Sequence, residues 1–150
     1  CSRRRRAQLA LRHGIGEFVG AARTGIEARV AHHLARTHLV DEVKALGLHL
    51  EVCPTSNVHT GVSPSLATHP ITPLWRAGVS LSFHTDNTLM SCITHSGEAE
   101  HLLRETSLTA ADLLRMGLQA AQHSFLPAAQ REAAAERLQA WAQAEGLVLG

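Results

Sequence analysis

The sequence predicts an α/β fold built on a mostly parallel sheet, and three observations support this prediction. Short apolar runs alternate with longer segments of helical periodicity, which is the βα rhythm of parallel sheets. Each apolar run is followed at once by polar residues, as in α/β folds whose sites lie at the carboxyl ends of the strands. Hydrophobic residues make up 45% of the 150 residues, which is enough to build a core.

The three candidate strands are residues 28–31, 48–52 and 79–83. The polar clusters that follow them begin at His32, Cys53 and His84, and parallel strands end at the same edge of a sheet. We therefore expect the three clusters to converge on one face. A complete (β/α)₈ TIM barrel takes about 250 residues, so three barrel strands would form only the C-terminal part of one.

The segments between and after the strands have helical patterns. The expected helices are residues 39–46, 71–76, 98–105, 110–123 and 130–145. Gly47 and Gly78 follow the first two, where glycine favours the end of a helix. Thr109 and Asp112 have the spacing of a capping box at the start of the fourth. These signals predict C-terminal helices that follow the last strand without further strands between them.

Composition and charge exclude several classes of partner. Lys and Arg number 14 and Asp and Glu 13, so the net charge of +1 gives no strong attraction to nucleic acid or to anionic membranes. Aromatic residues make up only 3%, which offers little for stacking on bases. No apolar run approaches the roughly 18 residues needed to span a membrane. The three cysteines suggest neither a disulfide framework nor a metal knuckle, which favours a cytoplasmic protein with reduced thiols.

The eleven histidines do not by themselves predict a metal site, because the sequence has no His-x-His, His-Glu-x-x-His or Cys₂His₂ spacing. Position is more informative. Asp86 and Asn87 come directly after an apolar strand, where an unpaired buried carboxylate is costly, so they either cap a helix or have a function. Asp86 could ligate a metal. His32, at the end of another candidate strand, is either a functional residue or a satisfied buried histidine.

Several segments resemble the adenosine deaminase family. Residues 50–61, LEVCPTSNVHTG, are similar to its signature, and they are followed by His69-Pro70-Ile71, by residues 77–82 and by Thr85-Asp86-Asn87. Upstream, residues 28–33 are similar to the Arg-Ile-Gly-His-Gly element of the family. The order and spacing agree over roughly residues 17–145. A continuous match with further motifs in register is a specific signal.

The resemblance implies a zinc-dependent hydrolase that converts adenosine to inosine and ammonia on a (β/α)₈ barrel. In this family zinc activates a water molecule, which attacks C6 of the purine. Carried over by position, Asp86 is the carboxylate ligand and also accepts the proton of the water, and His32 orients the hydroxide. Asn87 stands where many members have an aspartate that bonds a purine nitrogen, and its amide can donate the same hydrogen bond. Ser56, Asn57 and residues 59–61 would support the site.

Two parts of the family's site differ here. The His-x-His motif that supplies the first two zinc ligands is absent. The His-Ala-Gly-Glu motif supplies a third histidine and the catalytic glutamate, and its nearest counterpart is His13 to Glu17, which is one residue longer. His13 and Glu17 are therefore the candidates for these two roles.

The resemblance thus implies an incomplete, C-terminal part of a barrel domain over residues 1–150, with residues 1–16 disordered or atypical. Its substrate would be a purine nucleoside. A catalytic zinc needs about three protein ligands, so we expect this part alone to be inactive and its exposed sheet edge to permit self-association. Two alternatives stay open. The chain is a non-catalytic remnant of the family, or it is a sibling deaminase that acts on adenine or an adenine nucleotide.

Overall fold

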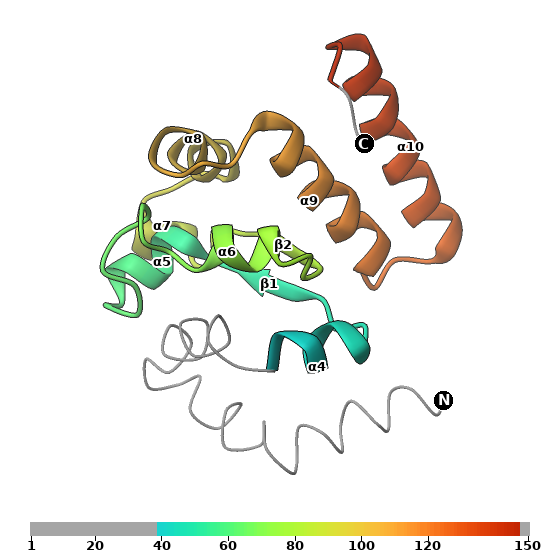
Figure 1. Ribbon diagram of the computed structural model, residues 1–150. Helices are drawn as coiled ribbons and strands as arrows, with labels where there is room; N and C mark the ends of the chain where they lie inside the picture. The colour runs from blue at the N-terminus through green and yellow to red at the C-terminus, as the bar shows by residue number, and fades with distance from the viewer. Residues whose placement is uncertain (1–38, 148–150) are drawn as a thin grey trace.

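The computed structural model describes residues 39–147, which form helices around a two-stranded sheet (Figure 1). In chain order the elements are α4 (Leu39–Ala45), β1 (Leu50–Val52), α5 (Pro54–His59), α6 (Ile71–Arg76), β2 (Leu81–Phe83), α7 (Thr88–Ser91), α8 (His95–Glu105), α9 (Ala110–His123) and α10 (Ala128–Ala144). None of the helices in this part of the chain is both long enough and apolar enough to cross a membrane.

The two strands pair in parallel, as the sequence predicts. Leu50 lies opposite Leu81 and Val52 opposite Phe83. Both strands fall inside the expected ranges of 48–52 and 79–83, and the chain passes from one to the other through α5 and α6. The third expected strand, residues 28–31, lies outside the described residues. The confirmed part is therefore a parallel pair of strands whose crossover contains helices.

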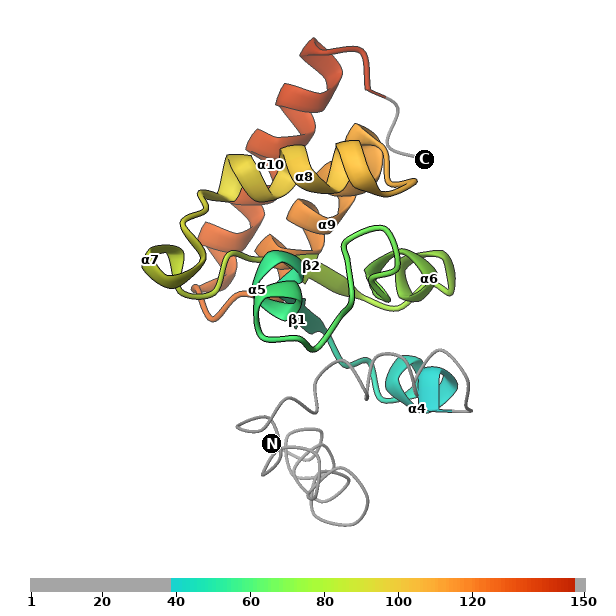
Figure 2. The same ribbon diagram turned by 90° about the vertical axis from the view of Figure 1, so that its left-hand side faces the viewer.

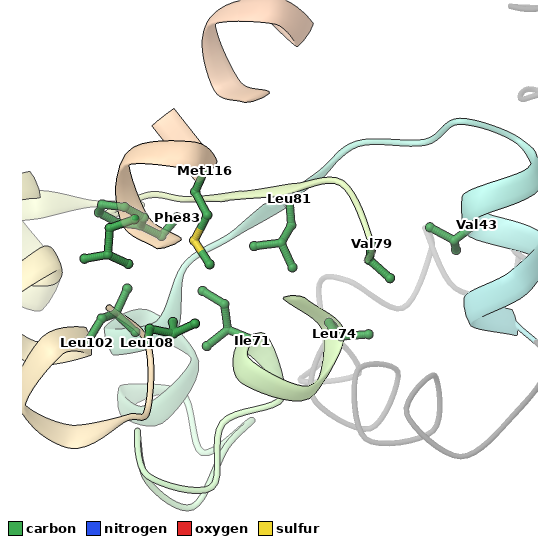
Figure 3. Packing of buried hydrophobic residues seen from close by; sticks show 10 residues of the cluster. Val43, Ile71, Leu74, Val79, Leu81, Phe83, Leu102, Leu108 and Met116 are labelled. Atoms are coloured by element: carbon green, nitrogen blue, oxygen red, sulfur yellow. The ribbon is translucent and has the colours of Figure 1, made fainter. Parts of the chain in front are cut away.

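The two faces of the sheet differ in polarity because successive side chains of a strand point to opposite faces. Leu81 and Phe83 of β2 are buried and point toward Ile71 of α6 and Met116 of α9 (Figure 3). Burial of such side chains stabilises the fold by roughly 1.5–3 kcal/mol each. The helices thus cover this face of the sheet, and the apolar core lies between them and β2. The complete core cluster is Val43, Ile71, Leu74, Val79, Leu81, Phe83, Leu102, Leu108, Leu113 and Met116.

The opposite face is polar. His49 bonds the hydroxyl groups of Ser80 and Ser82 through its two ring nitrogens, both at 2.9 Å. The Ser82 hydroxyl also lies 2.7 Å from Nε2 of His84. Burial, then the neighbouring charge of His123, lowers the pKa of His49 below its ordinary value. Ser80, Ser82 and His84 thus form a polar network with His49 on this face of the sheet.

Helix α9 connects the sheet to the outermost helix. It contacts β2 on one side, and α10 packs on its other side (Figure 1). Gly117 of α9 faces Leu138 of α10, whose Cδ1 atom would lie 3.8 Å from a β-carbon at this position. On the edge of β2 away from β1, the side chain of Gln119 accepts a hydrogen bond from the Leu81 N–H at 2.9 Å. The Gln119 side chain of α9 therefore satisfies one backbone N–H group on that edge of the sheet.

Most helix limits agree with the sequence prediction, and the differences have local causes. Helix α9 begins with the expected capping box, in which the Thr109 side chain accepts from the Asp112 N–H. Helix α8 begins three residues earlier than predicted because the Thr94 hydroxyl caps it, accepting from the Gly97 N–H at 3.1 Å. Two short helices were not predicted: α5 lies largely in the polar cluster that begins at Cys53, and α7 follows the cluster that begins at His84. Pro54 at the first position of α5 favours helix formation there.

Candidate active site

The polar clusters after β1 and β2 meet at the carboxyl ends of the strands. Helices α5 and α7, which begin there, lie together at one end of the sheet, and α4 lies at the other (Figures 1 and 2). The contact between the clusters is a hydrogen bond in which the Ser56 hydroxyl donates to Oδ2 of Asp86 at 2.8 Å. The predicted convergence is therefore confirmed for these two clusters. The third cluster, which contains His32, lies outside the described residues.

Asp86 has an unusual backbone conformation. Its φ of 56° lies in the left-handed region, which a residue other than glycine rarely adopts. Such a conformation costs on the order of 1 kcal/mol and persists only where the surroundings enforce it. Here the carboxylate is exposed, but its Oδ2 atom is fixed by Ser56. The strain and the hydrogen bond together determine where the carboxylate lies.

Ser56 is well placed to fix this carboxylate because its helix is anchored. Residues Pro54, Thr55, Ser56 and Asn57 of α5 are all buried. The Asn57 side chain lies 3.0 Å from Nε2 of His69, and Nδ1 of His69 accepts the Ile71 N–H, also at 3.0 Å. His69 is only 2% exposed, and this burial lowers its pKa to about 4, so that the ring is neutral at physiological pH. His69 thus joins α5 to α6 beneath the site.

Asn87 acts as a helix cap in this structure. Its Oδ1 atom accepts hydrogen bonds from the N–H groups of Leu89 and Met90, both at 3.1 Å. This satisfies two backbone donors at the start of α7. The amide nitrogen of Asn87 is not used in these two bonds, so the residue still has a donor for a ligand. The sequence allows Asn87 either to cap a helix or to have a function. The structure shows that it caps α7, and its free amide nitrogen could still bind a ligand.

The described residues fit a zinc ion in part. Within residues 39–147, no group of three or more His, Cys, Asp or Glu side chains is arranged to hold a metal ion. Asp86 offers one carboxylate, of the kind that zinc accepts as a ligand. His13, Glu17 and His32 lie outside the described residues, so their predicted roles remain predictions. At least one ligand of a three-ligand zinc site would therefore have to come from beyond the described part of the chain.

A family model described as adenosine deaminase matches residues 16–141. The chain belongs to the adenosine deaminase family. The match includes Ser56, Asp86 and Asn87, and so covers the geometry described above. The family membership predicted from the sequence is therefore confirmed.

Individual relatives agree with this assignment. The chain is 40% identical over 88 residues to an adenosine deaminase of Plasmodium falciparum, a match that covers 59% of this chain and 24% of that protein. It is 32% identical over 127 residues to one of Lacticaseibacillus paracasei, covering 83% of this chain and 36% of the relative. It is 34% identical over 116 residues to one of Clostridium botulinum, a match that covers 75% of this chain and 35% of the relative. The chain thus spans about a quarter to a third of the length of these relatives.

A solved structure supports the fold. An adenine deaminase from Arthrobacter aurescens superimposes with a TM-score of 0.69 over 71% of this chain and 33% of the other, at 20% sequence identity. The parallel strands and their helices are therefore part of the TIM-barrel architecture of this family, as the resemblance implied. The described residues form part of the barrel rather than a closed one.

Sequence reasoning missed two features of the site. The buried position of His69 between α5 and α6 was not predicted, although the residue belongs to a family motif. The fully buried side chain of Glu98 was also missed, because the sequence pattern predicted a helix there without showing which of its residues are buried. The Glu98 contact joins residues 43 positions apart, and the burial of His69 depends on how α5 and α6 pack together. Neither has a signal in the local sequence pattern.

Proposed function

We propose that this chain provides the carboxylate side of a zinc-dependent adenosine deaminase site, which hydrolyses adenosine to inosine and ammonia. The observation that supports this proposal is the hydrogen bond from Ser56 to Asp86 at the carboxyl ends of two parallel strands, in a chain of this family. Residues 1–150 would form one part of a barrel domain, and the substrate would be a free purine nucleoside in the cytoplasm.

In this proposal Asp86 contributes one carboxylate oxygen to the zinc ion. When bound, zinc lowers the pKa of a coordinated water so that hydroxide is available near neutral pH. Ser56 keeps the Asp86 carboxylate in one orientation by donating to Oδ2. Asp86 would also accept a proton from the attacking water. His32 would orient that water, and His13 and Glu17 would serve as zinc ligand and proton donor.

The reaction forms a bond between the oxygen of the water and C6 of the purine, and then breaks the bond from C6 to the exocyclic nitrogen. The nitrogen leaves as ammonia and C6 becomes a carbonyl carbon. Asn87 would donate a hydrogen bond from its amide nitrogen to a purine ring nitrogen, which orients the base. Because its oxygen already caps α7, the amide is held in one position for this contact.

The test measures deamination by the full-length protein supplied with zinc, with adenosine and adenine as substrates. We expect turnover of adenosine, and a loss of at least about 100-fold in Asp86→Asn, which keeps the size of the side chain but is a poor zinc ligand. Asp41→Asn, at an exposed position in α4, is the matched control and should retain wild-type activity. Turnover of adenine alone would instead assign the chain to a sibling deaminase. No turnover of either substrate would favour a non-catalytic member.

A further inference from the structure

Glu98 of α8 carries a carboxylate in an unusual place. The residue is fully buried, at 0% exposure. Its Oε1 atom accepts a hydrogen bond from the backbone N–H of Thr55 at 2.8 Å, 43 positions away in the chain. Its Oε2 atom has no hydrogen-bond partner within the described residues. A buried carboxyl group that is only partly hydrogen-bonded is costly, so packing alone does not account for a glutamate at this position.

The acceptor that Glu98 provides completes the start of α5. The residue before this helix, Cys53, makes no side-chain capping hydrogen bond to it. The first N–H groups of a helix have no partner within the helix itself, and burial of an unpaired one is unfavourable. Glu98 supplies the acceptor for one of them from a different helix. The position of the first turn of α5 therefore depends on α8.

This contact lies one residue from the proposed site. Thr55 receives the Glu98 hydrogen bond through its backbone, and the next residue, Ser56, donates to Oδ2 of Asp86. We propose that Glu98 is a positioning residue for the Asp86 carboxylate, acting through the first turn of α5 and the Ser56 hydroxyl. This inference rests on the proposed function for its effect on catalysis, but the positioning itself can be measured without catalysis.

The experiment compares variants of the full-length protein. Glu98→Leu removes the acceptor and fills the buried position with an apolar side chain of similar size. Glu98→Gln removes the charge but keeps an oxygen that can accept from the Thr55 N–H. Glu100→Leu changes an exposed residue of the same helix and is the matched control. Kinetics are compared at a temperature below the onset of unfolding of every variant.

We expect Glu98→Leu to lower kcat for adenosine about tenfold with KM within about twofold, since small displacements of a reacting group lower the rate strongly. Glu98→Gln should restore kcat to within about threefold of wild type. In a Ser56→Ala background, Glu98→Leu should cause no further loss, because both changes act through one chain of contacts. Multiplied losses in the double variant, or no rescue by Glu98→Gln, would overturn the inference.

A second measurement is independent of activity. Hydrogen exchange, followed by mass spectrometry, should become faster in α5 and in residues 84–91 of Glu98→Leu, and stay unchanged in α9. Unchanged exchange in α5 would contradict the positioning role even if the protein proves to have no deaminase activity. If Glu98→Leu does not fold, Glu98→Asp replaces it. Aspartate keeps the charge but withdraws the oxygens by one carbon–carbon bond, and we expect the same changes in smaller degree.

Discussion

Ser56 determines how the Asp86 carboxylate is held, because its hydroxyl donates the 2.8 Å hydrogen bond to Oδ2. Ser56→Ala removes this donor without creating a large cavity. We expect it to lower zinc affinity or kcat/KM by roughly 10–100-fold, the usual effect of removing a partner of a metal ligand. Deamination assays and zinc titration would measure the change. Ser96→Ala, at an exposed position of α8, is the control, and an equal loss in both variants would contradict the role of Ser56.

His69 makes stability depend on pH. Burial lowers its pKa from 6.5 to about 4, so between these two values the unfolded chain binds more protons than the folded one. Stability is therefore lost as the pH falls from about 6.5 to about 4. The difference corresponds to roughly 3 kcal/mol of unfolding free energy. Protonation would also remove the lone pair with which Nδ1 accepts the Ile71 N–H.

Urea unfolding of wild type and His69→Gln at a series of pH values between 7 and 4 would test this expectation. The variant should be less stable at pH 7 and should lose much less stability on acidification. His59→Gln, at an exposed position in α5, is the control and should follow wild type. The pKa of His49 is also lowered by burial, so both proteins should keep some pH dependence. Parallel curves for wild type and His69→Gln would disprove the assignment to His69.

At the scale of the elements, Asp112 fastens α9 to α6. It accepts hydrogen bonds from Nε1 of Trp75 at 2.8 Å and from both terminal nitrogens of Arg76, at 3.1 and 3.2 Å. It also accepts from the backbone and hydroxyl of Thr109, both at 2.9 Å. Burial alone would raise the pKa of Asp112, but the hydrogen bonds from Trp75, Thr109 and Arg76 outweigh it and lower the pKa well below its usual range.

Asp112→Ala should therefore lower the free energy of unfolding by roughly 2 kcal/mol at neutral pH, because it removes the acceptor of the half-buried Trp75 N–H and the capping box of α9. Asp112→Asn should lower the free energy of unfolding by less, because its oxygen can still accept from Trp75. It loses only the ion pair with Arg76. Chemical denaturation followed by circular dichroism would measure both. Glu136→Ala, at an exposed position of α10, provides the control. A loss below about 1 kcal/mol in Asp112→Ala would show that the contacts of Trp75 and Arg76 contribute little.

The elements that the sequence predicted well are those with local signals. Helices α6 and α9 have the expected limits because Gly78, with a φ of 75°, follows the first and the Thr109 capping box starts the second. Helix α7 was missed because it has only four residues, too few for a periodic pattern. Helix α5 is as long as α6 but was missed because Thr55, Ser56 and Asn57 give it few of the apolar residues that mark α6. The start of α5 depends on Glu98, whose contribution comes from another helix and has no signature near Pro54.

At the scale of the whole molecule, features of the sheet and the site with local sequence signals were again predicted, and features that depend on distant residues were not. The parallel pairing of 48–52 with 79–83 followed from apolar runs separated by helical segments, and Asp86 was found because it follows such a run. The polar face made by His49, Ser80 and Ser82 was not predicted, since it depends on the strand register. The proposed zinc ligand set is likewise a long-range property, to which the described residues would contribute Asp86.

Because the proposed zinc ligands come from separate segments of the chain, zinc binding should change the stability of the whole molecule. If Asp86 and ligands from other segments hold one ion, zinc binds the folded protein and not the unfolded chain, and it stabilises the fold by mass action. Zinc at 100 times its Kd should raise the unfolding free energy by about 2.7 kcal/mol, and a chelator should reverse the gain. Asp86→Asn should lose most of this gain while retaining the zinc-free stability of wild type, because the side chain is exposed.

Thermal unfolding with zinc, with magnesium and with chelator would measure these differences. An equal zinc-dependent gain in wild type and Asp86→Asn would show that the stabilising zinc binds elsewhere, and Asp86 would then lose its proposed role as a ligand.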